Sequence, residues 1–276
     1  MSLVLGLEIT PRFVRGAFLK TALRGSEMEH YAEVAIAPPS EEQSTTAPLR
    51  AAVAEVLAQG SRPPDRVIAA LDGEFASLRL IDLPLGVEKK IAEVLPGELE
   101  SLLPFEVSDA IVDYQIVSRD EINLQLMTVA TPRKNVAERL QFLRAAGVEP
   151  RELAVGAASF GGLGALLRET LSNRTVLVID VGSTSTDFAV LTNGQCTFAR
   201  TVSGGMNLVE SGRRTELGAA LRRTLASYRS QRSDDPSLIL LAGETAPMES
   251  ARQWLTEQLG IECGTVPVPS AAGTDD

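Results

Sequence analysis

The sequence predicts a duplicated α/β fold, and three observations support this prediction. Strand-like and helix-like segments alternate along all 276 residues, and 44% of the residues are hydrophobic, enough for sizeable cores. Each half also opens with two successive strand patterns. They are Leu3–Ile9 and Phe13–Lys20 in the first half, and Thr175–Asp180 and Phe188–Leu191 in the second. We therefore divide the chain near Asn173.

The remaining elements of the first part follow from local patterns. Apolar residues recur at helical spacing from Leu49 to Leu57, and Gly60 ends this helix. Thr10-Pro11 breaks the first strand, and Ser40–Thr46 is a polar loop. Further strands are predicted at Glu33–Ala37, Arg66–Leu71 and Ser77–Leu83.

The middle of the chain combines helices with a hairpin. Glu88–Leu103 has helical periodicity, and Pro96 either kinks this helix or starts a second one. Ile111–Val117 and Ile122–Val129 are separated by a short acidic turn and predict a hairpin. Helices are predicted at Val136–Ala146 and Phe160–Leu171, although three glycines near the start of the second one disfavour it.

In the second half, Asn193-Gly194 predicts a tight hairpin turn before a strand at Cys196–Thr201. From Pro269 onward the sequence is small and polar. The remaining predicted elements are a helix at Leu217–Tyr228, a strand at Leu238–Ala242, a helix at Ser250–Leu259 and a strand at Glu262–Val268.

Composition excludes several functional classes. A net charge of −10 argues against a nucleic-acid-binding protein, and His30, the single histidine, nearly excludes histidine-based metal sites and catalytic triads. The two cysteines fit a reducing compartment, and no apolar stretch approaches the ~18 residues of a membrane span. We therefore predict a soluble cytoplasmic protein, with His30 at the surface and with Trp254 and Cys196 in the core.

Charge is distributed in two blocks of opposite sign. Asp72–Glu121 contains twelve acidic and four basic residues, whereas Arg200–Arg232 contains seven arginines and two glutamates. Such blocks are usually solvated faces, which is the favoured interpretation, and two partner surfaces are the alternative.

The most informative stretch is Val176–Leu191, in which a buried strand ends at Asp180 and a short turn leads into a second strand. Gly182 permits close backbone approach, and Ser183 and Thr184 add hydroxyl and amide donors, a pattern typical of a phosphate-binding loop. A carboxylate such as Asp180 can hold the water shell of a metal ion near the phosphates. A plain hairpin with a polar turn is the alternative interpretation.

Further motifs occur in a characteristic order. A basic residue, Arg15, follows Glu8 at an offset of seven, and Leu83-Pro84 precedes a predicted helix. The other motifs are Gly6-Leu7-Glu8-Ile9-Thr10, Leu103-Pro104-Phe105, Val112-Asp113-Tyr114-Gln115, Leu143–Pro150 and Thr201-Val202-Ser203-Gly204-Gly205-Met206-Asn207. Together with the phosphate-type loop, they resemble the PilM/GspL family of type IV pilus and type II secretion machines, within the actin-like ATPase superfamily. The resemblance spans about Leu3 to Gly243.

The resemblance implies an actin-like ATPase fold, a duplicated ribonuclease H-like fold, with a first half at 1–173, an inserted α/β subdomain at about 71–130 and a second half at 174–276. The second half then lacks the family's usual last helix, and we expect the chain to be part of a longer protein. The implied nucleotide-binding residues are Glu8, Arg15, Asp180, Gly182, Ser183, Thr184, Gly204, Gly205 and Gly243.

Two of the three implied nucleotide loops depart from the family pattern. The first carries Glu8, Thr10 and Pro11 where the family has aspartate and glycine, and the third reads Ala242-Gly243-Glu244. A branched side chain crowds the backbone, and proline removes an amide donor. We therefore expect weak Mg-ATP binding or none, no hydrolysis, no catalytic residue and no metal ligand in the protein itself.

The resemblance also implies partners. They are a motor ATPase (GspE/PilB-like) and bitopic inner-membrane subunits (GspM/PilN-like), and a homodimer is compatible with the family. The expected role is a scaffold on the cytoplasmic side of the bacterial inner membrane, peripheral to it or tethered there. The alternatives are a nucleotide-binding ATPase or sugar-kinase-like enzyme, an FtsA-like filament protein and an unrelated α/β protein. The tail from Pro269 lacks the basic amphipathic character that a membrane-tethered filament protein needs.

Overall fold

The computed structural model describes residues 1–276 except 11, 23–24, 38–45, 168–170, 246–247 and 268–276. Pro11, nearly all of the predicted Ser40–Thr46 loop and the tail from Pro269 lie outside the described residues, as does the Glu244 side chain. The described chain divides into two compact units. Unit 1 contains residues 1–71 and 134–154, and unit 2 contains residues 72–133 and 155–267. The predicted boundary near Asn173 stays a prediction.

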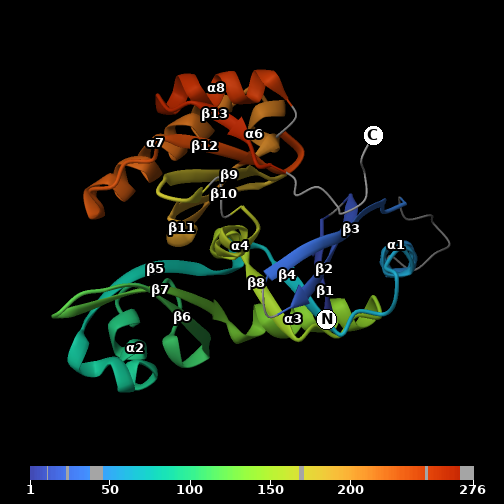
Figure 1. Cartoon of the computed structure of the whole chain (residues 1–276), viewed down its shortest axis with the longest axis horizontal. Helices are drawn as coiled ribbons and strands as arrows, with labels where there is room; N and C mark the ends of the chain where they lie inside the picture. The colour runs from blue at the N-terminus through green and yellow to red at the C-terminus, as the bar shows by residue number, and fades with distance from the viewer. Residues whose placement is uncertain (11, 23–24, 38–45, 168–170, 246–247, 268–276) are drawn as a thin grey trace. The chain divides into compact units, whose positions relative to one another are not determined.

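Unit 1 is a five-stranded sheet with two helices. The strand order is β3-β2-β1-β4-β8; β1 pairs antiparallel with β2 and parallel with β4. The elements, seen in Figure 1, are β1 (Ser2–Ile9), β2 (Phe13–Ala22), β3 (Gly25–Ala35), α1 (Thr46–Ala58), β4 (Arg66–Leu71), α3 (Arg133–Ala145) and β8 (Glu152–Val155).

Alternation along β1 and β2 builds the core of unit 1. Every second residue of β1 from Leu3 to Ile9 is buried, as are Val14 and Phe18 of β2. These side chains pack with the apolar faces of α1 and α3, including Val56 and Leu143. The period of two therefore places one sheet face against helices, and the intervening residues, Glu8 among them, lie on the other face.

Unit 2 contains a second five-stranded sheet, with the strand order β11-β10-β9-β12-β13. Its strands are β9 (Thr175–Val181), β10 (Ser185–Thr192), β11 (Gln195–Ser203), β12 (Leu238–Ala242) and β13 (Cys263–Thr265). Its helical segments are η4 (Gly156–Gly162), α4 (Leu163–Leu166), α6 (Met206–Glu210), α7 (Arg214–Gln231), η5 (Gly243–Thr245) and α8 (Glu249–Leu259).

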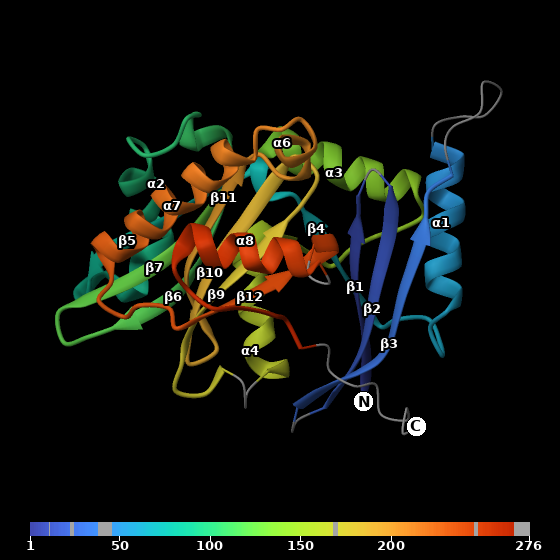
Figure 2. The same ribbon diagram turned by 90° about the horizontal axis from the view of Figure 1, so that it is seen from above.

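Strand β9 is the centre of this sheet and is buried on both faces. Leu177 and Ile179 pack with α7 and α8, including Leu221 and Trp254. Val178 packs on the other face, in a cluster with residues from the α4 region and β7. Figure 2 shows α8 crossing over this sheet. Burial on both faces explains the continuous apolar run 176–179, which has no alternation.

The inserted part of unit 2 forms a three-stranded antiparallel sheet in the order β5-β7-β6. Leu95 and Leu99 of its helix pack against Leu124 and Leu126 of the central strand. The elements are η1 (Gly73–Phe75), β5 (Ser77–Pro84), η2 (Leu85–Lys90), α2 (Ile91–Leu99), η3 (Val107–Asp109), β6 (Ala110–Arg119) and β7 (Asn123–Pro132).

The two five-stranded sheets share one topology. In each, the first strand pairs antiparallel with the second and parallel with the fourth, and the third and fifth strands lie at the edges. The inserted sheet follows β4. The prediction of a duplicated α/β fold with an inserted subdomain is therefore confirmed.

Some predicted elements were wrong in extent or type. In the predicted helix Phe160–Leu171, residues 160–162 belong to the 3₁₀ helix η4, residues 163–166 form α4, and residues 168–170 lie outside the described residues. A Cβ on Gly164 of α4 would overlap the Gly194 carbonyl oxygen, so glycine lets this short helix lie close against the β10–β11 turn. Pro96 lies inside the single helix α2 and starts no second helix. Finally, β3 is much longer and β13 shorter than predicted, and β8 was not predicted.

Candidate functional site

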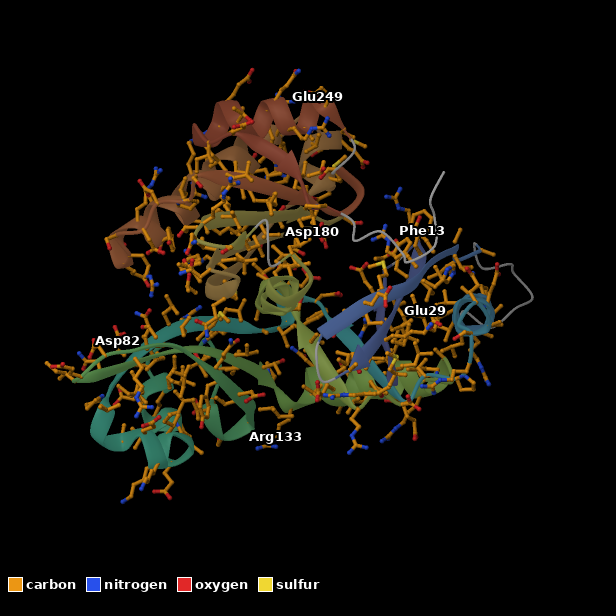
Figure 3. All side chains as sticks on the ribbon, viewed as in Figure 1. Phe13, Glu29, Asp82, Arg133, Asp180 and Glu249 are labelled. Carbon is orange, nitrogen blue, oxygen red and sulfur yellow. The ribbon has the colours of Figure 1, made fainter. Side chains whose placement is uncertain are left out.

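The loop between β9 and β10 is where the sequence predicts phosphate binding. It spans Gly182–Ser185, and the Gly182 amide donates to the Ser185 carbonyl (3.0 Å). Gly182, Ser183 and Thr184 are exposed, whereas Asp180, the residue before the last of β9, is half-buried; Figure 3 labels its position. Among the described residues, the amides of Ser183 and Thr184 have no hydrogen-bond acceptor. They are therefore donors that an anion can use.

A second loop, Gly204–Asn207, supports this turn from behind. Three of its amides donate to consecutive loop carbonyls: Gly204 to Thr184 (2.7 Å), Met206 to Gly182 (2.9 Å) and Asn207 to Ser183 (3.0 Å). These three hydrogen bonds tie the loop carbonyls to the neighbouring segment and restrict the motion of the loop.

Glycine is required at Gly205 and Gly243. A Cβ on Gly205 would lie 2.1 Å from the Gly182 carbonyl oxygen, and one on Gly243 would lie 2.0 Å from Oδ1 of Asp180. Gly243 also has a φ of +72°, which favours glycine. The third loop therefore touches the carboxylate that ends β9. The structure thus brings together the seven predicted site residues of unit 2, which are Asp180, Gly182, Ser183, Thr184, Gly204, Gly205 and Gly243.

The corresponding loop of unit 1 joins β1 to β2 and has different chemistry. Its first amide, Thr10, donates to the Phe13 carbonyl (2.9 Å), the same closing bond as in unit 2. However, the Thr10 hydroxyl oxygen accepts the amides of Phe13 (2.9 Å) and Arg12 (3.3 Å). A side chain of the loop itself therefore occupies the donors that a phosphate would need.

The two predicted residues of unit 1, Glu8 and Arg15, pair with each other. Arg15 Nη1 donates to Glu8 (3.1 Å), and Arg15 Nε donates to Glu33 (2.7 Å). The hydrogen bond from Arg15 lowers the pKa of Glu33, with a further contribution from Tyr31, and these outweigh burial. Burial, with the charge and hydrogen bond of Glu33, raises the pKa of Tyr31 to about 12. The prediction that Glu8 and Arg15 face the loop of unit 2 stays a prediction.

The described residues contain no group of three or more His, Cys, Asp or Glu side chains that could hold a metal ion. Cys196 is buried and burial raises the pKa of its thiol to about 12, so it is an inert core residue, as predicted. Trp254 is also in the core, and His30 lies at the surface near Gln59.

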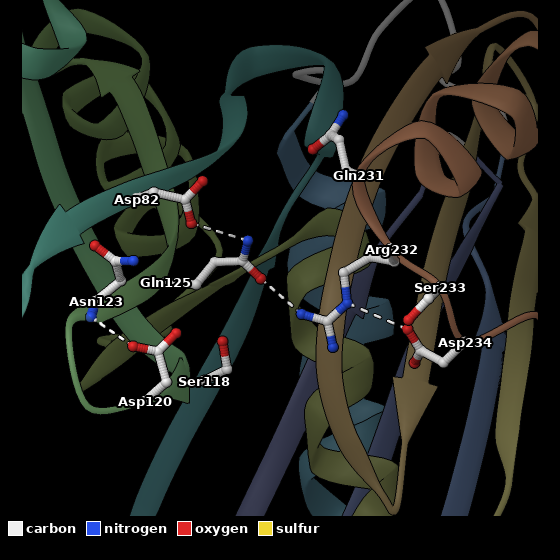
Figure 4. Close-up of a pocket in the computed structure, with 9 residues that line it drawn as sticks. All are labelled: Asp82, Ser118, Asp120, Asn123, Gln125, Gln231, Arg232, Ser233 and Asp234. Atoms are coloured by element: carbon white, nitrogen blue, oxygen red, sulfur yellow. Dashed lines mark hydrogen bonds and ion pairs between the residues drawn. The ribbon is translucent and has the colours of Figure 1, made fainter.

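Sequence analysis did not predict a polar pocket of about 410 Å³ between the inserted sheet and the end of α7 (Figure 4). Gln125 bridges its two sides: its amide nitrogen donates to Asp82 (3.0 Å) and its oxygen accepts Arg232 (2.6 Å). Burial alone would raise the pKa of Asp234, but the Thr192 hydroxyl and the Arg232 charge lower it. These residues come from three separate segments without a motif, so no local signal identified them. The remaining lining residues are Ser118, Asp120, Asn123, Gln231 and Ser233.

Comparison with known proteins agrees with this geometry. A family model described as type IV pilus assembly protein PilM matches residues 6–216. A chain of a solved PilM-PilN type IV pilus biogenesis complex matches with a TM-score of 0.77 and 24% identity, over 95% of this chain and 88% of that one.

Two other solved structures share the fold at lower similarity. The cytoplasmic domain of EpsL, an inner-membrane component of the type II secretion system of Vibrio cholerae, matches with a TM-score of 0.52 and 15% identity, over 87% of this chain and 82% of that one. A Bacteroides thetaiotaomicron protein with an actin-like ATPase fold matches with a TM-score of 0.51 and 14% identity, over 96% and 91%. No helix in the described part of the chain is both long and apolar enough to cross a membrane. With three quarters of its length matched by the family model, the chain belongs to the family of the type IV pilus assembly protein PilM.

Proposed function

We propose that this protein is a scaffold of the inner-membrane platform of a type IV pilus or type II secretion system. It acts on the cytoplasmic side and docks a motor ATPase and bitopic membrane subunits instead of hydrolysing ATP. Membership of the PilM family supports a role in pilus assembly. The matched structures, a PilM-PilN complex and a cytoplasmic domain of a secretion component, support the location and a PilN-like partner.

The main support for a non-catalytic role is that the polar groups of the first loop, between β1 and β2, bind one another. The Thr10 hydroxyl accepts the Arg12 and Phe13 amides, and Arg15 engages the Glu8 carboxylate. A hydrolytic enzyme needs preorganised donors around the phosphates from more than one side. This loop uses its polar groups for its own stability.

Calorimetry with Mg-ATP tests this part of the proposal. We expect binding weaker than micromolar and no steady phosphate release from the full chain. Micromolar binding, or turnover that is abolished by Asp180→Ala, would contradict the scaffold proposal and favour the ATPase alternative. The free amides of Ser183 and Thr184 are the observation that favours this alternative.

The acidic surface of the inserted subdomain is the proposed contact for the motor. Glu98, Glu100 and Glu106 are exposed, and none of them has an ion-pair partner among the described residues. Carboxylates of this kind increase the rate of encounter with a basic partner, and the effect weakens with salt because the screening length is ~8 Å at physiological ionic strength.

A charge reversal with a matched control tests the location of this contact. The triple variant Glu98→Lys, Glu100→Lys, Glu106→Lys should slow association with the purified motor ATPase of the same system, measured by surface plasmon resonance. The control triple Glu27→Lys, Glu55→Lys, Glu257→Lys makes the same change in net charge at other exposed positions. Equal rates for the two variants would show that the acidic block is only a solvated face.

A further inference from the structure

Strand β6 is an unprotected edge of the inserted sheet. The strand order β5-β7-β6 pairs it with β7 on one side only. In the described part of the chain, no backbone hydrogen bond outside the regular elements involves residues 110–119. Natural edge strands are protected by lysine, proline or a bulge; the β6 sequence AIVDYQIVSR contains neither lysine nor proline, and its one register shift lies between Ile116 and Ser118, after the regular stretch 110–116. The outer side of β6 can therefore accept another strand.

The hydrogen-bond alternation identifies the backbone groups on that outer side. At the end of the hairpin, Asp120 donates to the Asn123 carbonyl, so Asn123 faces β6. The backbone amide and carbonyl groups of successive residues in a strand point to alternate sides. Those of Met127 and Val129 therefore also point toward β6, whereas those of Thr128 point toward β5. Tyr114, opposite Thr128, therefore points its amide and carbonyl outward.

A side-chain contact supports this assignment. The Tyr114 amide donates to Oδ1 of its neighbour Asp113 (2.8 Å), which substitutes for a missing strand. By alternation, Val112 and Ile116 share the outward orientation of Tyr114. Three residues at a spacing of two thus turn their amides and carbonyls outward, and an added strand pairs with them once its carbonyl replaces Asp113 as the acceptor of the Tyr114 amide.

The side chains along this edge are apolar and acidic. Ile111 and Tyr114 are exposed by 39% and 38%, so an added strand would cover apolar surface on both faces of the sheet. Glu106, Asp109 and Asp113 have no ion-pair partner among the described residues, whereas the one cation of the strand, Arg119, pairs with Glu88 (2.7 Å). The edge therefore favours a basic partner.

The same charges disfavour a second copy of this chain. Antiparallel pairing of two β6 edges centred on Tyr114 would place the Asp113 carboxylates of the two copies at diagonal positions on one face of the sheet, where their like charges disfavour the pairing. The net charge of −10 adds further repulsion between copies.

We propose that the β6 edge binds an extended segment of another protein by strand addition, and that this segment alternates apolar residues with lysine or arginine. The proposal rests on the proposed scaffold function, for which it names the surface that receives a partner. Main-chain bonds to Val112, Tyr114 and Ile116 provide affinity, and Asp113 selects a basic residue.

A synthetic peptide tests the proposal independently of any pilus or secretion protein. The probe is acetyl-Lys-Val-Lys-Val-Arg-Val-Lys-amide, and its control has glutamate at every basic position. The full chain with saturating probe should show amide hydrogen exchange slowed about tenfold or more at Val112, Tyr114 and Ile116, and unchanged at Asp113 and Gln115, which already bond to β7. The acidic control peptide should leave all five amides unchanged.

Two variants separate main-chain from side-chain recognition. Tyr114→Pro removes the outward amide, a change that edge strands tolerate, and should weaken probe binding about tenfold. Tyr114→Ala keeps this amide and should weaken binding only about twofold. If Tyr114→Pro does not fold, two N-methylated versions of the probe give the same test on the unchanged protein. One is methylated at the residues whose amides face β6 and should not bind. The other is methylated at the alternate residues, whose amides face away, and should still bind.

Three results would overturn the proposal. They are no binding of the basic probe, binding without slowed exchange at the three outward amides, and equal loss with both N-methylated probes. Dimerisation of the protein alone, with protection of the same amides, would assign the edge to a second copy instead. None of these results depends on ATP binding or on the motor, so failure here is distinguishable from failure of the proposed function.

Discussion

The β1–β2 and β9–β10 loops occupy equivalent positions in the two sheets and differ in what their polar groups do. Both span four residues and close with a bond from the first amide to the fourth carbonyl, Thr10 to Phe13 and Gly182 to Ser185. The register aligns Glu8 opposite Arg15 in unit 1 and Asp180 opposite Asp187 in unit 2. The backbone plan is therefore duplicated, but the chemistry is not.

The two loops differ in which of their backbone groups, carbonyls or amides, are already hydrogen-bonded. In unit 2 the loop carbonyls are engaged from behind by the Gly204–Asn207 segment, which leaves the Ser183 and Thr184 amides without an acceptor among the described residues. In unit 1 a side chain, Thr10, accepts the loop amides. The first loop, with a threonine at the position of Gly182, is thus a turn in which its own side chain accepts two of its amides.

The largest expected effect comes from breaking the support of the second loop. Gly205→Val places a side chain against the Gly182 carbonyl and should lower the free energy of unfolding by about 3 kcal/mol, the upper end for overpacking, in urea denaturation followed by circular dichroism. The control Gly6→Ala, whose Cβ meets only the Ala17 carbonyl oxygen at 3.9 Å, should change it by less than about 1 kcal/mol. Equal effects would show that the second loop does not depend on this close contact.

A smaller effect is expected from breaking the ion pairs of the first loop. Arg15→Met leaves Glu8 and Glu33 without their shared cation and should cost about 1 kcal/mol, because both carboxylates are partly exposed and solvent compensates them. Arg50→Met, at an exposed position of α1, is the matched control and should have almost no effect. The comparison of urea midpoints decides this prediction, and a cost for Arg15→Met no larger than for Arg50→Met would refute it.

The Glu33 carboxylate also predicts a pH dependence of the stability of unit 1. Its folded pKa is lowered from the ordinary 4.5, so its stabilising contribution is present above pH 4.5 and is lost as the pH falls through the folded pKa. The difference in Tm between the wild type and Glu33→Gln should therefore shrink as the pH falls from about 7 to about 3. A difference that is constant over this range would contradict the assignment.

The last prediction concerns nucleotide affinity instead of stability, and converts the first loop toward the second. Thr10→Gly removes the hydroxyl that accepts the Arg12 and Phe13 amides. We expect Mg-ATP affinity, measured by calorimetry, to rise about fivefold, equivalent to about 1 kcal/mol. Thr10→Val removes the hydroxyl but keeps the branched side chain, and should give less. An unchanged affinity in Thr10→Gly would show that the first loop does not limit nucleotide binding.

Local pattern was sufficient to predict most of the strands and the long helices. The continuous apolar run of β9, the alternation of β1 and the Asn193-Gly194 turn each reflect a short-range rule, and the structure has them as predicted. The residue pattern also predicted Gly182 in a phosphate-type loop, and the family resemblance implied Gly204 and Gly205 beside it, where Gly205 lies against the Gly182 backbone.

Tertiary structure alone decided the features that depend on distant segments. The close packing of Gly164 in α4 against the Gly194 backbone joins distant segments, and β8 has a weak local pattern but pairs beside β4. The Gln125 bridge and the exposed edge of β6 likewise depend on which strands become neighbours. Periodicity encodes which face of an element is buried, whereas strand order and long-range contacts arise only when the elements pack together.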